Sequence, residues 1–322
     1  MKTLKLSLTT VVHTLWKTHP PMVVGAALYA AMTVFFIAGI FLDDRYISGA
    51  PAWLKPTKFA ISSMLYTLTI VWMLGFVKGR PRFVRTIGWI SGLALLTELV
   101  IIPLQAGRGT TSHFNVGTTL NAHLFYTMGL AILVLWLTHV VITVLLMMQR
   151  LDQSDLALSL RLALVITLIG MSVGILMTTP LGALLASGQG VTPVPFPTGV
   201  SGAHTIGVPD GGAGLPIVGW STTGGDLRVG HFIGLHALQV LPLLSWLLTR
   251  NPHLNMRQRV LLVWTFGLGY LALTLILTWQ ALRAQPLLSP DPLTLSVLSG
   301  LLLIMGASIF LITRPVRRWS ST

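Results

Sequence analysis

The sequence predicts an all-α integral membrane protein, a bundle of eight transmembrane helices. Hydrophobic residues make up 53% of the 322 residues, only 9% are charged, and the mean hydropathy is +0.79. In a soluble protein, about a quarter of the residues are usually charged. The apolar residues also form long uninterrupted runs, and about 20 such residues are enough to cross a bilayer as a helix.

Eight runs of the chain have this length and composition. The third contains Pro103, which a membrane helix tolerates because neighbouring groups satisfy the freed backbone carbonyl. Residues 21–322 are therefore predicted to form one membrane domain, and residues 1–20 an amphipathic helix on the membrane surface. The predicted spans are 22–42, 57–77, 85–106, 122–148, 160–186, 229–249, 259–282 and 292–313.

The basic residues set the expected orientation. The formal net charge is +13 and the isoelectric point is about 11.1, but the basic residues form short clusters between apolar runs. No basic stripe alternates with aromatics, so the expected partner is the lipid bilayer and not nucleic acid. One set of connections carries Lys2, Lys5, Lys17, Lys78, Arg80, Arg82, Arg85, Arg150, Arg161, Arg250, Arg257, Arg259, Arg314, Arg317 and Arg318. The other carries Arg45, Lys55, Lys58, Arg108, Arg228 and Arg283. Because cytoplasmic loops are enriched in Lys and Arg, both termini are expected in the cytoplasm.

The connection between the fifth and sixth spans, residues 188–225, is unusually long. It is rich in Gly and Pro and carries one charged residue, Asp210. Loops of more than about 12–15 residues are usually functional or disordered. Because disordered segments are usually more charged than this one, we expect a packed lid on the outer face.

Polar residues gather on the same outer side. Glu98 lies inside the third span, where a carboxylate costs at least about 2–3 kcal/mol unless it is paired or protonated. Gln105 follows seven residues later on the same helical stripe. Arg108 is expected to pair with Glu98 or another acidic residue, or to bind an anionic group. The alternative for Glu98 is a protonated side chain that hydrogen-bonds a neighbouring helix and has a structural role only.

Histidines extend this polar region. His113 and Asn115 lie in the loop after the third span, and His123 begins the fourth. In the segment GGDLRVGHFIGLHALQ, Asp226 has the position of a helix N-cap, and Arg228 lies near the helix start. His231, His236 and Gln239 then fall in one broad sector of the sixth span.

Two lysines enter the second span from the outer side. Lys58 is four residues before Ser62 and eight before Tyr66, so it is expected to face the outer cavity. Lys55 is interpreted as snorkelling to the membrane interface.

These residue types are suited to binding haem iron or a transition metal, because neutral imidazole is the commonest metal ligand. The haem ligands would come from His113, His123, His231 and His236, and a metal ion would take His231, His236, His123 and Glu98. Glu98 and Arg108 are the candidate catalytic residues, as proton or anion partners. Gln105, Asn115, Asp226, Arg228 and Gln239 would support the site. The spacing is not specific, since His231 and His236 cannot chelate one ion on a regular helix and no HExxH motif occurs. With no cysteine in the chain, thiolate ligands and disulfides are excluded.

Four motifs carry a resemblance to a known family. KPTKFAIS, QAGRGTTSHFN, GVPDGGAGLP and GGDLRVGHFIGLHALQ lie within roughly residues 40–245. They resemble those of a family of bacterial polytopic inner-membrane proteins with no established activity. The resemblance implies a location in the bacterial inner membrane, and it implies no reaction or cofactor.

Three functional hypotheses remain open at this point. The first is a redox or metal-handling protein with haem or a metal near the outer face. The second is a proton-coupled carrier of a small solute, suggested by Glu98 and by the Gly- and Pro-interrupted third and fifth spans. The third is a sensory or assembly protein in which the polar residues only hold the structure. In each case a small molecule or a protein would be the partner at the outer face.

Overall fold

The computed structural model describes residues 8–179, 184–185, 187–191 and 197–314. In this part of the chain, nine helices and two short two-stranded ribbons are present. The helices are α1 (Leu8–Thr18), α2 (Pro20–Leu42), α3 (Leu54–Leu74), α4 (Pro81–Gly107), α5 (Thr119–Met148), α6 (Ser154–Met177), α8 (Leu227–Arg250), α9 (Met256–Leu282) and α10 (Pro292–Thr313). The strands are β1 (Tyr46–Ile47), β2 (Ala50–Pro51), β3 (Thr205–Ile206) and β4 (Gly225–Asp226).

All of these helices except α1 are long and apolar enough to cross a membrane. The predicted class, an all-α membrane protein with eight spans, is therefore confirmed. The prediction for residues 1–20 falls partly outside the described residues, which begin at Leu8 in α1. That α1 lies on the membrane surface stays a prediction.

The observed helix ends differ most from the prediction at the fifth span. There α6 runs from Ser154 to Met177, whereas the apolar run predicted 160–186. The sequence continues with Thr178, Thr179 and Pro180, and the residue before a proline is pushed away from helical backbone angles. Hydropathy alone does not register this stop, because the residues that follow are still apolar. Residues 180–183 and 186 lie outside the described part of the chain.

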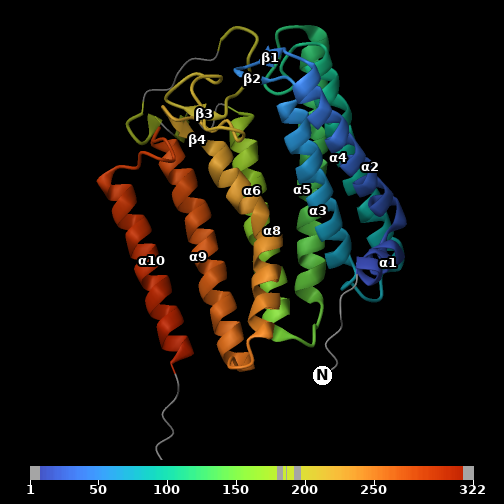
Figure 1. Cartoon of the computed structure of the whole chain (residues 1–322), viewed down its shortest axis with the longest axis vertical. Helices are drawn as coiled ribbons and strands as arrows, with labels where there is room; N and C mark the ends of the chain where they lie inside the picture. Colours follow the sequence, from blue (N-terminus) through green and yellow to red (C-terminus); the bar gives the residue numbers. More distant parts are fainter. Residues whose placement is uncertain (1–7, 180–183, 186, 192–196, 315–322) are drawn as a thin grey trace, which may run out of the picture.

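The spanning helices form two groups, α2 to α5 and α6 with α8 to α10, which are blue to green and lime to red in Figure 1. Within the second group, glycines allow close packing. A Cβ atom on Gly234 of α8 would lie 2.5 Å from the Gly170 Cα of α6, and one on Gly230 would lie 2.2 Å from the Thr278 hydroxyl of α9. Small residues at such contacts let helix backbones approach in a membrane, where van der Waals packing drives association.

The two groups meet along α5–α6 and α3–α8. Fully buried His139 of α5 donates from Nε2 to the Leu164 carbonyl of α6, 3.3 Å away, and its Nδ1 lies 3.0 Å from the Tyr66 hydroxyl of α3. Since a carbonyl only accepts, Nδ1 is the acceptor for Tyr66. Gln239 of α8 donates to Thr69 of α3 at 3.2 Å. A small number of polar contacts thus connects the two groups in mid-bundle.

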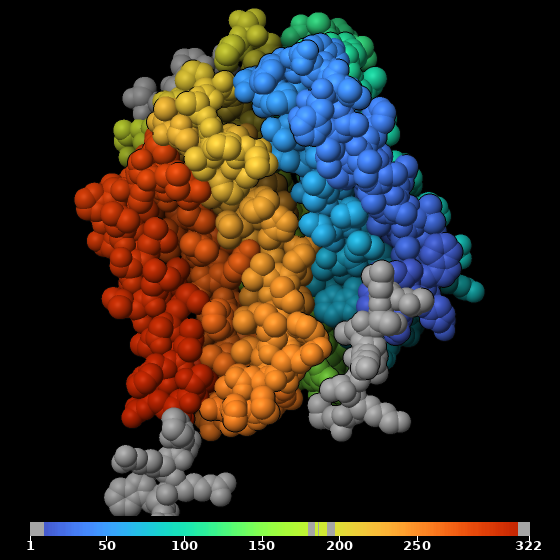
Figure 2. Space-filling view, viewed as in Figure 1, coloured from blue at the N-terminus to red at the C-terminus, as the bar shows by residue number. Residues whose placement is uncertain are grey.

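Residues 197–226 are called the lid from here on. The lid lies at the same end of the bundle as the α4–α5 loop (Figure 1). Within the lid, β3 pairs with β4, and Asn115 forms a β-bridge with Val200. Phe114 and Ile206 pack in an apolar cluster with Met177 and Leu227. In Figure 2 the yellow lid meets the blue segment that carries β1 and β2 at this end, which we call the lid end. The lid therefore packs on the bundle.

Candidate functional site

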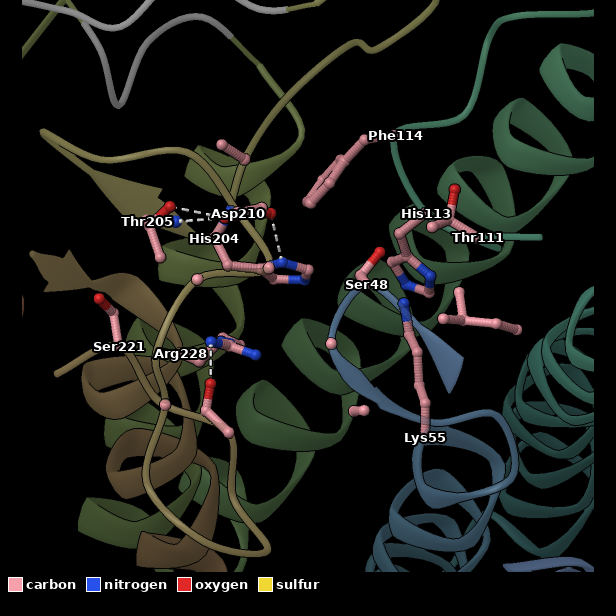
Figure 3. Close-up of a pocket in the computed structure, with 18 of the residues that line it drawn as sticks. Ser48, Lys55, Thr111, His113, Phe114, His204, Thr205, Asp210, Ser221 and Arg228 are labelled. Atoms are coloured by element: carbon pink, nitrogen blue, oxygen red, sulfur yellow. Dashed lines mark hydrogen bonds and ion pairs between the residues drawn. The ribbon is translucent and has the colours of Figure 1, made fainter. Parts of the chain in front are cut away.

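A cavity of about 640 Å³ lies at the lid end, between the two helix groups. One wall comes from the β1–β2 ribbon, the start of α3 and the α4–α5 loop. The other wall comes from the lid, the end of α6 and the start of α8. Figure 3 shows Lys55 and His113 on the first wall, facing His204 and Arg228 on the second. The cavity volume is within the range of about 300–1,000 Å³ that is usual for small-molecule sites.

Three cationic side chains line this cavity, namely Lys55, Lys58 and Arg228, against one carboxylate, Asp210. Half-buried Lys55 has no hydrogen bond or ion pair among the described residues, and its ammonium lies 6.0 Å from the centre of the Phe59 ring. Within the described part of the chain, Lys58 donates to two lid carbonyls and to no other acceptor, namely those of Ile217 at 3.4 Å and Val218 at 3.2 Å. Among the described residues, no carboxylate therefore neutralises either lysine by direct contact.

The third cation, Arg228, is already paired. Its Nε and Nη2 donate to the buried Asp226 carboxylate, at 2.9 and 2.6 Å, and Nη2 also donates to the Gly219 carbonyl at 2.6 Å. Asp226 is the N-cap of α8, as the sequence predicts, and it also accepts from the backbone N–H of Ser221 at 2.8 Å. This arrangement fixes Arg228 at the cavity wall and joins the lid to the helix start.

Glu98 lies behind the cavity wall, next to His113. The Glu98 side chain is only 2% exposed, and neither carboxyl oxygen has a hydrogen-bond partner among the described residues. The His113 Nε2 lies 3.9 Å from Glu98 Oε2, and Lys55 interacts with Glu98 electrostatically. A buried charge without partners is costly, so this position favours the neutral form of the carboxyl group.

On the opposite wall, His204 and Asp210 form a pair. The His204 Nδ1 lies 2.7 Å from Asp210 Oδ2. Burial alone would raise the pKa of Asp210, but hydrogen bonds from His204 and Thr205 hold that pKa well below its ordinary value. Asp210 also accepts from the backbone N–H groups of both donors, so it fixes the turn that presents the His204 ring.

Backbone strain gathers around the cavity. Four non-glycine residues in the described chain have positive φ, and three of them line the cavity: Ser48 at 49°, Phe114 at 60° and Ile217 at 66°. Such conformations are unfavourable for residues with a Cβ, and they concentrate at functional sites. The Phe114 ring packs edge-on against His204, with the ring centres 4.8 Å apart.

Several residues predicted for the site lie beside the cavity instead of lining it. Arg108 is exposed and donates to Gln105 and to Asn121, the latter at 3.1 Å, so it does not pair with Glu98. Asn115 supports its own loop by donating to Thr110 at 2.9 Å. These residues brace the junction of α4 and α5.

The predicted histidines do not converge on one point. His123 is exposed and donates to the Thr119 carbonyl at 2.7 Å. His231 donates to the Gly170 carbonyl at 2.7 Å, and His236 lies 3.2 Å from Gln239. Of the four, only His113 lines the cavity. Helical spacing could not show this, because neighbouring helices decide which sector of a span faces a cavity.

Haem and metal binding therefore lack the expected ligand cluster. Among the described residues, no group of three or more His, Asp or Glu side chains has a geometry that could hold a metal ion. The predicted combination of His231, His236, His123 and Glu98 is not assembled.

The sequence interpretation also misses residues that the structure brings to the cavity. The prediction that Lys58 faces the outer cavity agrees with its position, but Lys55, interpreted as snorkelling to the interface, lines the same cavity. His204 and Asp210 lie in the long loop, where no periodicity locates them. One sequence feature could have pointed to Asp210: it is the single charged residue of a 38-residue Gly- and Pro-rich segment, 188–225.

The cavity histidines predict a pH dependence of stability. Burial lowers the pKa of His113, with repulsion from Lys55 adding to the effect, and burial lowers the pKa of His204 although Asp210 opposes it. The unfolded chain then binds more protons than the folded one, so stability is full above about pH 6.5 and falls as the pH drops below it. We expect the thermal midpoint of the purified protein in detergent to fall on acidification.

His113→Phe and His204→Phe should each reduce this slope, whereas exposed His253→Phe should leave it unchanged. A thermal midpoint that stays constant or rises on acidification would contradict the prediction.

The fold and the cavity define a polytopic helical membrane protein with a basic, partly enclosed site between two helix groups. Comparison of the chain with protein families, with curated proteins and with solved structures found no match.

Proposed function

We propose that the protein is a proton-coupled carrier that binds a small anionic solute in the cavity at the lid end. The observation that carries this proposal is the pair of cations, Lys55 and Lys58, which line the cavity and which no carboxylate of the described residues contacts directly. A cleft of one charge sign with low-dielectric walls concentrates ions of the opposite sign. A bound anion would neutralise the positive charge of these lysines.

The position of Glu98 supports coupling to protons. Lys55 interacts electrostatically with Glu98, and its side chain also lines the cavity. An anion bound beside Lys55 counteracts the field of the ammonium at Glu98, which makes protonation of Glu98 more favourable. By linkage, protonation of Glu98 then strengthens anion binding by the same factor. His113, between the cavity and Glu98, has the position of a proton relay.

The two-group architecture supports transport in preference to binding alone. Carriers commonly bind their solute between two helix groups that move against each other. Here the mid-bundle hydrogen bonds of His139 and Gln239 connect the groups, while Lys58 connects α3 to the lid. Opening the mid-bundle contacts would expose the cavity to the opposite side of the membrane, and opening the Lys58 contact would expose it at the lid end.

The test of the binding site is Lys55→Met, which removes the charge and keeps the length of the side chain. Wild-type protein in detergent is titrated calorimetrically with succinate, propionate and inorganic phosphate, and with choline as a cation of opposite charge. We expect at least one anion to bind and choline not to bind. The Lys55→Met variant should lose about tenfold or more in anion affinity, because a charge-assisted contact contributes about 1.5–3 kcal/mol.

The matched control is Lys78→Met, since Lys78 is an exposed lysine in the connection between α3 and α4. Its anion affinity should equal that of the wild type. Folded wild-type protein that binds no anion, or a Lys55→Met variant with unchanged affinity, would contradict the proposal.

We propose that the lid end faces the outside of a bacterial inner membrane, with both termini in the cytoplasm. The proposal rests on the Lys and Arg distribution and on the motif resemblance. Because the chain has no cysteine, single cysteines at exposed Gly212 and His253 test it with an impermeant maleimide in intact cells. Labelling of the His253 position but not the Gly212 position would show that the protein has the opposite orientation.

The redox or metal-handling hypothesis has a direct test. A haem absorption band or stoichiometric metal in the purified protein would favour it over the carrier. The described histidines and carboxylates give it less support than the lysines give the anion site.

A further inference from the structure

The His204–Asp210 pair presents a hydrogen-bond acceptor to the cavity. Asp210 accepts from four donors, namely His204 Nδ1, the His204 and Thr205 backbone N–H groups and the Thr205 hydroxyl, at 2.7–3.1 Å. A carboxylate surrounded by donors stays ionised, so His204 Nδ1 carries the hydrogen of this contact. A histidine that donates from Nδ1 in its neutral form leaves the lone pair of Nε2 free.

The surroundings of the ring keep Nε2 available. Phe114 packs edge-on against the imidazole with the ring centres 4.8 Å apart, and Nε2 has no hydrogen-bond partner among the described residues. Figure 3 shows the ring extending into the cavity toward the wall that carries Lys55 and His113. Burial lowers the pKa of His204, which keeps the imidazole neutral near neutral pH.

The two walls of the cavity thus differ in chemistry. The first carries the unpaired Lys55 ammonium, which is suited to an anionic group. The second carries a neutral imidazole acceptor, which is suited to a hydroxyl. The volume of about 640 Å³ leaves room for an organic molecule that spans both walls, well beyond the size of an inorganic ion.

We infer that the solute is a hydroxylated organic anion, a hydroxycarboxylate or a hydroxylated phosphate monoester, whose anionic group lies at Lys55 and whose hydroxyl donates to His204 Nε2. This inference rests on the proposed anion site and specifies which anions that site selects. Asp210 is then a positioning residue that fixes the ring nitrogen available to the solute.

The experiment compares anions that have the same charge type and carbon chain and differ in hydroxyl groups. Malate and succinate form the carboxylate pair, and glycerol 1-phosphate and propyl phosphate form the phosphate pair. Each is titrated into the purified protein in detergent. We expect the hydroxylated member of one pair to bind about tenfold more tightly, because a site that accepts a hydrogen bond from the hydroxyl disfavours the analogue without it.

The His204→Phe variant keeps an aromatic ring against Phe114 and removes the acceptor. We expect the variant to bind the hydroxylated and the unhydroxylated anion with about equal affinity. Its affinity for the unhydroxylated anion should be the same as that of the wild type. His123→Phe is the matched control, because His123 is exposed and does not line the cavity. Wild-type selectivity needs no variant, so it tests the inference even where His204→Phe does not fold.

The outcomes separate this inference from the proposed function. Equal binding within both pairs overturns the hydroxyl contact and leaves the anion site intact. A preference that persists in folded His204→Phe overturns the role of His204. Absence of binding by every anion, inorganic phosphate included, overturns the anion site and this inference with it.

Discussion

Glu98→Gln is expected to abolish proton-driven accumulation of solute while leaving solute exchange in place. Glutamine has nearly the same shape as a protonated glutamate and cannot ionise, so it removes the proton and keeps the packing. In proteoliposomes, electroneutral movement of one proton with a monoanion such as glycerate gives about tenfold accumulation per unit of pH difference. The wild type should approach this ratio, and Glu98→Gln should show none, as measured with radiolabelled glycerate.

The control is Asp152→Asn, which neutralises an exposed carboxylate just before α6. It should accumulate glycerate as the wild type does. Accumulation by Glu98→Gln at the wild-type ratio would assign Glu98 a structural role. Lower thermal stability of this variant together with unchanged coupling would favour the third hypothesis, in which the polar residues only hold the structure.

Asp226→Ala is expected to cause the largest loss of stability among single substitutions at the site. Buried Asp226 caps α8, accepts from the Ser221 backbone and pairs with Arg228, whose side chain is 28% exposed. Loss of a cap costs about 0.5–2 kcal/mol, and breaking a buried ion pair costs about 3–5 kcal/mol. Because Arg228 keeps some contact with solvent, we expect about 2–4 kcal/mol in total, measured by unfolding in a denaturing detergent.

A matched comparison is Asp291→Ala. Asp291 also caps a helix, α10, and pairs with Arg283, but its side chain is 32% exposed. Its loss should destabilise the protein less than the loss of Asp226. The double variant Asp226→Ala/Arg228→Ala should be more stable than Asp226→Ala alone, because it leaves no uncompensated guanidinium. A double variant that is less stable than the single one would contradict this explanation.

Glu98→Gln and Asp226→Ala change two kinds of charged group near the cavity, which differ in their hydrogen bonds. Asp226 and Asp210 are rich in hydrogen bonds and fix Arg228 and His204. Glu98 has no such bonds among the described residues, and Lys55 has none either. The paired groups therefore supply rigidity, whereas under the proposed function the unpaired groups are the ones that respond to a solute and a proton.

The number of spans and the end of the bundle that is polar could be predicted from the sequence. A run of about 20 apolar residues must form a helix in a bilayer, whatever its neighbours, because its backbone groups find no water there. The position of Glu98 within the third run and the cap at Asp226 are equally local properties. They depend on residues close in the chain, so a sequence pattern is sufficient to indicate them.

Which side chains meet could be decided only by the tertiary structure. His113, His123, His231 and His236 share one end of the bundle, yet only His113 reaches the cavity, because helix packing sets the azimuth of each span. His204 is brought opposite Lys55 by a turn that Asp210 fixes within a loop of no periodicity. Hydropathy is a property of single segments, whereas a binding site depends on distances between segments remote in the chain. The sequence alone therefore determined a membrane bundle with a polar end, and packing determined that this end holds a basic cavity instead of a cluster of histidines.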